Sequence, residues 1–177
     1  INNYGTKEQK EKYLPSIASG ELTTSVAVDE SSHHNPYDTV LVAKKNSDEY
    51  ILSGKKNFVI DGTSSDLLIV LARTSGKKGD LTGLTLFLVD PTNEDIDRIK
   101  LEMADSRNYA NIIFDNVKIS SKNILGDIEA GGEAIDDILD IGRIAMSAEM
   151  LGNSEAAFET TLDLSLIHIS EPTRQSP

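Results

Sequence analysis

The residues best suited to chemistry include a cluster of acids and imidazoles that follows the apolar stretch 23–28. Its members are Asp29, Glu30, His33, His34 and Asp38. Carboxylates and imidazoles can bind metal ions or transfer protons, but this spacing matches no established pattern of metal ligands. The residues between them are Ser, Asn and Pro, which are typical of turns. The cluster therefore predicts a solvated loop and no metal site.

Arg143 is the second candidate, because it stands alone in a largely apolar segment. No other Lys or Arg occurs between Lys122 and residue 165. An arginine in such a setting must pair with an anion or extend its guanidinium to water. The anion is either a bound ligand or a neighbouring aspartate of the same chain. The sequence leaves both interpretations open.

The remaining residues exclude several kinds of catalytic site. The chain has no cysteine, so it can form no disulfide, no thiolate metal site and no cysteine nucleophile. The glycine-rich segments 76–83 and 126–132 match neither a Walker A loop nor a dinucleotide-binding fingerprint. The sequence also contains no HExxH motif and no visible Ser-His-Asp arrangement.

Composition narrows the class of protein further. The chain has 177 residues, of which 38% are hydrophobic and 26% charged, as in a soluble globular domain. Its formal net charge of -12 repels phosphates, so we expect no nucleic-acid partner. No apolar run approaches the roughly 20 residues of a membrane span, and no secretory signal is visible. The lack of cysteine fits a reducing compartment, and we expect a cytoplasmic protein.

The scaffold that must position these candidates is predicted to be mostly β-structure. A helix is predicted at residues 7–14, and strands are predicted at 23–28, 39–44, 67–72, 84–89, 96–101 and 110–119. Residues 49–61 are typical of a β-hairpin that turns at Gly54. Strands at this spacing, joined by short turns, predict an antiparallel sandwich or barrel.

A change of pattern after Gly126 predicts a long helix at residues 133–164. Its small residues recur every three or four positions, at Gly142, Ala145, Ala148, Gly152 and Ala156. Its apolar residues lie on most sides, as in a helix inside a bundle. Because no other long helix is predicted and the chain begins with Ile1, we expect a fragment or an oligomer subunit. The segment 165–177 abandons the helical pattern and predicts a non-native tail.

Several segments, taken in order, carry a resemblance to a known family. They are Gly5–Glu21, Tyr50–Gly62, Ile113–Ile119 with Ile124–Gly126, and Gly142–Arg143 with Gly152. In order and spacing they resemble the acyl-CoA dehydrogenases, over residues 4 to 163. The runs Ala72–Gly76 and Leu86–Asp90 look closest to the small-subunit type found in pimeloyl-CoA dehydrogenase.

The resemblance implies an α+β fold in which a β-domain lies between two helical domains. Residues 1–19 would end the N-terminal helical domain, and 20–126 would form the antiparallel β-sandwich or barrel. Residues 127–164 would begin a truncated C-terminal helical bundle. The resemblance also implies an FAD cofactor, an acyl-CoA substrate, an electron-transfer flavoprotein as electron acceptor, and a homo- or hetero-oligomer.

The cofactor-binding residues of the family carry over only in part. The resemblance places Val28 and Asp29 against the flavin ring, where Asp29 replaces a threonine. An ionised aspartate accepts hydrogen bonds but cannot donate them, and its charge opposes that of a reduced, anionic flavin. Phe58, Val59 and Ile60 fall beside the flavin. Phe58 keeps an aromatic wall, whereas Ile60 replaces a residue with a hydroxyl group.

The substrate-binding and catalytic residues carry over less well. Asn35 falls near the Gly-Ser-Asp with which the family holds CoA, and Arg143 matches a helix arginine near the active site. Gly142 stands where some members carry the catalytic glutamate, so the resemblance identifies no catalytic residue in this chain. A non-catalytic partner subunit of a heteromeric acyl-CoA dehydrogenase, unable to bind flavin productively, is therefore the alternative. An acidic β-sandwich adhesion module is a third, against which the bundle-type helix argues.

Overall fold

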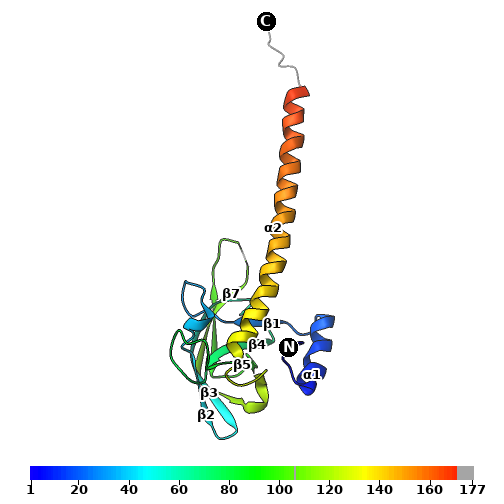
Figure 1. The fold of residues 1–177 in the computed structure, drawn as a ribbon. Helices are drawn as coiled ribbons and strands as arrows, with labels where there is room; N and C mark the ends of the chain where they lie inside the picture. The colour runs from blue at the N-terminus through cyan, green and yellow to red at the C-terminus, as the bar shows by residue number, and fades with distance from the viewer. Residues whose placement is uncertain (106, 171–177) are drawn as a thin grey trace. The chain divides into compact units, whose positions relative to one another are not determined.

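The computed structural model describes residues 1–105 and 107–170 (Figure 1). Its contacts define two units, residues 1–135 and the part that begins at Asp136. The helical elements are α1 (Lys7–Ser19), the 3-10 turns η1 (Pro36–Asp38) and η2 (Ser121–Asn123), and α2 (Gly131–Ser170). The strands are β1 (Thr24–Ala27), β2 (Val42–Asn46), β3 (Glu49–Ile60), β4 (Leu67–Arg73), β5 (Leu84–Val89), β6 (Ile96–Leu101), β7 (Tyr109–Ser120) and β8 (Ile124–Leu125).

The strands of the first unit form a single sheet that curls around a shared core. Its order is β6-β7-β3-β2-β4-β5-β8, with β1 paired to β4. Neighbours run antiparallel, except that β1 and β2 both pair parallel with β4. β1 also contacts β3, which is separated from β4 by β2, so the sheet bends back over its own interior. The predicted α+β class with an antiparallel β-domain is confirmed, and the two parallel pairings add to it.

The core of this unit draws side chains from β1 through β7. β4 is buried along its whole length, as the unbroken apolar run at 67–72 predicted, and so is β5. Tyr50 and Phe87 pack ring against ring, with centroids 5.3 Å apart. On β3 and β7 buried and exposed residues roughly alternate, so each strand has an inner and an outer face.

The hairpin predicted at Gly54 is wrong. β3 continues straight through this position, and the hairpin lies one strand earlier, where Ser47–Asp48 joins β2 to β3. Gly54 instead sits at a shift of register between β3 and β7. Its φ is 141°, and a Cβ there would stand 3.0 Å from the Cα of Leu41. The glycine is therefore required by a positive φ and by a close approach of two backbones.

The first helix begins with a capping box and continues past its proline. Thr6 Oγ1 accepts a hydrogen bond from the N–H of Gln9, and the Gln9 side chain accepts one from the N–H of Thr6. The sequence predicts an end just before Pro15, but α1 ends at Ser19. Gly20 follows in the left-handed conformation, with φ 78°, which is the usual way to terminate a helix.

The long helix predicted at 133–164 is present as α2, which ends at Ser170 rather than at residue 164. Its exposed apolar side chains include Ile141, Ile144, Met146, Met150, Leu151, Phe158, Leu162 and Leu164. Residues 171–177 of the predicted non-native tail lie outside the described residues, and the domain boundaries remain predictions. Within the described chain, no helix combines the length and the apolar character that a membrane span requires.

Candidate functional site

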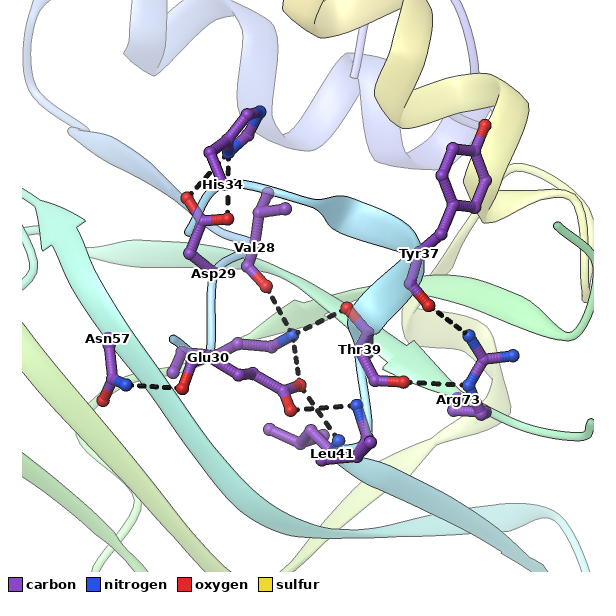
Figure 2. Close-up of polar contacts among 11 residues, drawn as sticks. Val28, Asp29, Glu30, His34, Tyr37, Thr39, Leu41, Asn57 and Arg73 are labelled. Atoms are coloured by element: carbon purple, nitrogen blue, oxygen red, sulfur yellow. Dashed lines mark hydrogen bonds and ion pairs between the residues drawn. The ribbon is translucent and has the colours of Figure 1, made fainter. Parts of the chain in front are cut away.

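Three successive carbonyl groups after β1 are bound by two successive residues of β3. Lys56 Nζ donates to the carbonyl of Val28 at 2.8 Å. The backbone N–H of Asn57 donates to the carbonyl of Asp29 at 2.7 Å. Asn57 Nδ2 donates to the carbonyl of Glu30 at 2.6 Å (Figure 2). The chain that leaves β1 is therefore fastened to β3 residue by residue.

Lys56 is the buried centre of this junction. Its side chain is 0% exposed. An ammonium group has three N–H donors, and here they meet three acceptors: Val28 O at 2.8 Å, Glu30 Oε1 at 2.8 Å and Thr39 Oγ1 at 3.3 Å. Burial lowers the pKa of Lys56 from 10.5 to about 8, and the nearby Glu30 carboxylate opposes the fall.

Glu30 extends the junction to the start of β2. Its Oε2 accepts the N–H of Val40 and its Oε1 accepts the N–H of Leu41, both at 2.9 Å. One carboxylate thus neutralises Lys56 and caps two backbone donors at the far end of the loop. Residues 29 and 41, which lie at opposite ends of the loop, are consequently held on the same side of β3.

Arg73 holds the same loop from β4. It is 7% exposed, and its guanidinium donates to the carbonyls of Tyr37 and Thr39 at 2.9 and 2.8 Å (Figure 2). Between the anchored ends, residues 31–34 are exposed. The loop predicted to be solvated is therefore solvated only at its tip.

Sequence reasoning missed Lys56, Asn57 and Arg73. One signal was available for Lys56, because Tyr50 and Leu52 are buried on β3 and residue 56 has the same parity along the strand. No pattern in the sequence indicates that Asn57 would bind the carbonyls of a segment that precedes it by almost thirty residues.

The cluster of acids and imidazoles contains one close pair. His34 Nδ1 lies 2.9 Å from both Oδ1 and Oδ2 of Asp29 (Figure 2). The side chains are 48% and 27% exposed. Because a carboxylate can only accept, His34 Nδ1 is the donor, and the Asp29 carboxylate is already engaged within the chain.

The predicted cofactor-binding residues divide between the surface and the core. Phe58 and Ile60 expose 46% and 56% of their surface, whereas Val59 is 2% exposed and points into the core. Phe58 has φ 53°, and its N–H donates to Asn111 Oδ1 at 3.2 Å. The bond between Asn57 and Asp29 brings Phe58 close to the end of β1.

The two predicted substrate-binding residues lie in different units. Asn35 caps η1, since its Oδ1 accepts the N–H of Tyr37 at 3.2 Å. It also lines a pocket of about 230 Å³ beneath the loop, whose other walls include Gly54 and Lys55 of β3. Arg143, in α2, pairs with Asp140 one turn earlier, which is the neighbouring aspartate that the sequence left open.

The family model and the relatives that match this chain indicate the same family. The family model described as acyl-CoA dehydrogenase, middle domain, matches residues 27–117. A 3-(aryl)acrylate reductase of Clostridium sporogenes is 36% identical over 161 residues, which are 88% of this chain and 42% of the relative. The mitochondrial short/branched chain specific acyl-CoA dehydrogenase of Bos taurus is 32% identical, over 92% of this chain and 38% of the relative.

Solved structures agree with these sequence relatives. The butyryl-CoA dehydrogenase of Megasphaera elsdenii superimposes with a TM-score of 0.87 at 28% identity, over 100% of this chain and 46% of its own. The chain thus spans about two fifths of the length of the curated relatives it matches. These relatives do not test the likeness to the pimeloyl-CoA dehydrogenase small subunit, which stays a prediction. On the matched middle domain and the shared fold, the chain belongs to the acyl-CoA dehydrogenase family.

Proposed function

We propose that the whole protein carrying this chain is an FAD-dependent acyl-CoA dehydrogenase. The proposed reaction removes hydrogens from the α- and β-carbons of an acyl-CoA thioester and passes the electrons to an electron-transfer flavoprotein. Family membership supports the class of reaction. The observation that carries the proposal is the junction of Val28 and Asp29 with β3, because it joins the two segments predicted to flank the flavin.

The residues at this junction fit a flat, largely apolar cofactor ring. Phe58 and Ile60 on β3 expose apolar side chains, and so does Val26 on β1. The carbonyls of residues 28–30 are bound by donors of Lys56 and Asn57, so the N–H group of each trans peptide unit points away from the donor that binds its carbonyl. Such N–H groups can donate to the polar edge of a flavin. When bound, FAD would supply the hydride acceptor.

The proposed roles of the chain's own residues are binding and orientation. Val28, Asp29 and Phe58 would contact the cofactor, and Ile60 would extend its apolar wall. Val28 and Val59 expose only 8% and 2% of their surface, so each would contact the cofactor through its backbone and not through its side chain. Asn35 and Arg143 would bind the acyl-CoA. We assign the catalytic base to another part of the protein, since Gly142 stands at the one matching position.

The relatives include a reductase as well as dehydrogenases. Reduction of a carbon–carbon double bond beside an acyl group is the reverse of the proposed reaction, and it involves the same two carbons. We favour dehydrogenation of a saturated acyl-CoA. Assays in both directions with the same protein, comparing a saturated acyl-CoA with its 2-enoyl counterpart, distinguish the two.

Two residues, Asp29 and Ile60, favour the alternative of a non-catalytic partner subunit. Asp29 presents a carboxylate, already bound by His34, where a hydroxyl donor is expected, and Ile60 offers no hydroxyl. The alternative predicts a subunit that keeps the fold and contributes to a hetero-oligomer without holding FAD.

Visible absorbance of the full-length protein, expressed alone and with its neighbouring subunits, separates the proposal from this alternative. The proposal predicts flavin absorption bands that copurify with the protein or reappear after reconstitution with FAD. A colourless protein that takes up no FAD in either preparation would identify the non-catalytic subunit instead. Heat release of the bound flavin, followed by chromatography, confirms that the cofactor is FAD.

A further inference from the structure

We propose that Lys56 and Asn57 are positioning residues for the cofactor: they aim the backbone N–H groups that follow β1 at the polar edge of the flavin ring. The inference rests on the proposed function, because it assumes that a flavin binds beside this junction. Neither residue is assigned a contact with the substrate or the reacting atoms. Both act through the backbone of residues 28–30.

The peptide units that follow Val28, Asp29 and Glu30 have fixed directions. The carbonyls of Val28, Asp29 and Glu30 are all taken by Lys56 Nζ, Asn57 N–H and Asn57 Nδ2, at 2.6 to 2.8 Å. All peptide bonds in the described chain are trans, so each N–H points opposite to its carbonyl. Each of the three N–H groups therefore points away from the β3 donor that fixes its carbonyl. Loss of the Lys56 or Asn57 donor would free these peptide units to rotate.

β3 departs locally from its regular pairing with β7 beside Asn57. The register between β3 and β7 shifts between Lys56 and Val59, so Asn57 and Phe58 are released from regular pairing. The N–H of Asn57 is thereby free to bind Asp29, and the N–H of Phe58 binds the Asn111 side chain instead of a backbone carbonyl. Bulges of this kind redirect groups beside functional sites.

The backbone of this bulge is strained at Phe58. Phe58 has φ 53°, a conformation that bulky residues rarely adopt. Such strain persists only where the surroundings impose it, and it is concentrated at functional sites. Here it turns the aromatic ring to the outside, with 46% of its surface exposed. The same bulge thus supplies both the aromatic wall and the donor that binds Asp29.

Burial of the Lys56 ammonium group costs free energy of desolvation. An apolar side chain of similar size at position 56 would avoid the desolvation of an ammonium group and would often be as stable. It would not donate to Val28 or neutralise Glu30. A charged residue with 0% exposure that donates to the carbonyl of Val28, just after β1, is therefore better explained by orientation than by stability.

The test uses full-length protein reconstituted with FAD and measures the FAD dissociation constant by quenching of flavin fluorescence. The variants are Lys56→Met, Asn57→Ala and the double variant Lys56→Met/Glu30→Gln. In the double variant no unpaired carboxylate remains, and the amide oxygen at position 30 can still accept from one of the N–H groups of Val40 and Leu41, while the donor to Val28 stays absent. Lys118→Met, on the exposed face of β7, is the matched control. Thermal unfolding of each apoprotein reports the fold separately, and the flavin absorption spectrum reports the surroundings of the ring.

We expect the double variant and Asn57→Ala to bind FAD at least about tenfold more weakly and to show an altered flavin spectrum. The apoprotein of Asn57→Ala should unfold close to the wild-type temperature, that of the double variant should unfold above that of Lys56→Met, and Lys118→Met should match the wild type in all three measurements. Wild-type affinity and spectrum in both variants would overturn the inference and leave the proposed function standing. A wild-type protein that takes up no FAD would overturn both.

Discussion

The Nζ atom of Lys56 lies 2.8 Å from Oε1 of Glu30, and their side chains are only 0% and 11% exposed. The pair links β3 to the loop between β1 and β2 across a part of the molecule from which water is largely excluded. Because Glu30 is the main opposite charge beside Lys56, removal of one leaves the other largely uncompensated in the interior.

Loss of one member of the pair should therefore cost more than loss of both. Lys56→Met is expected to lower the free energy of unfolding of the full-length protein by about 3 kcal/mol. Lys56→Met/Glu30→Gln should recover at least half of that loss. Urea unfolding of the apoproteins measures both values. Equal destabilisation by the single and double variants would contradict the buried-pair interpretation.

The pKa of Lys56 predicts a specific dependence of stability on pH. Burial lowers this pKa to about 8 in the folded protein, from 10.5 in the unfolded chain. Below pH 8 Lys56 carries its proton in both the folded and the unfolded state, so it does not make the free energy of unfolding depend on pH. Between pH 8 and 10.5 only the unfolded state keeps it, so the free energy of unfolding rises with pH, by at most about 1.4 kcal/mol per unit.

Comparison with Lys56→Met isolates this contribution, because the other lysines titrate in both proteins. The wild type should gain stability relative to the variant as the pH rises through this window. A difference that stays constant, or that falls with pH, would show that the folded protein does not lower the pKa of Lys56.

Gly54 should tolerate no side chain. A Cβ at this position would stand 3.0 Å from the Cα of Leu41, on a backbone with φ 141°. Gly54→Ala is expected to destabilise the protein by roughly 2–4 kcal/mol, from steric overlap added to backbone strain. Gly79→Ala is the matched control, because Gly79 has φ 90° but nothing within 4 Å of its Cβ position. Thermal unfolding that ranks the two variants equally would contradict the close approach of Leu41 to Gly54 of β3.

Replacement of Asp29 by threonine should favour the cofactor. Asp29→Thr removes a carboxylate that opposes a reduced flavin and supplies a hydroxyl donor in its place. We expect FAD to bind roughly three to ten times more tightly. Asp48→Thr, at the exposed turn between β2 and β3, should leave the affinity unchanged. Weaker binding by Asp29→Thr would indicate that the carboxylate itself contributes to the site.

The regular strands could be predicted from the sequence because their apolar patterns are local. The ends of β5 and β6 agree with the residues predicted, since turn-forming residues bound both runs. Gly54 was misjudged because a glycine between two strand-like runs is equally compatible with a turn and with a bulge. Only the pairing of β3 with β7, which are distant in sequence, decides between the two.

The sequence could predict the exposed residues of the candidate site but not the buried residues that hold them in place. Phe58 and Asp29 could be identified from the resemblance, and bonds through Asn57 do bring their segments together. Lys56 and Arg73 escaped because charged side chains are ordinarily placed at the surface. Their burial depends on carbonyls contributed by a loop that is remote along the chain.

The central claim is tested most directly by the visible spectrum of the full-length, FAD-loaded protein during anaerobic addition of a saturated acyl-CoA. Several chain lengths should be compared, with free CoA as the control. We predict that at least one thioester bleaches the flavin bands and yields its 2-enoyl-CoA in equal amount. Flavin bands that persist with every thioester tried, in a protein that holds FAD, would contradict the assignment as an acyl-CoA dehydrogenase.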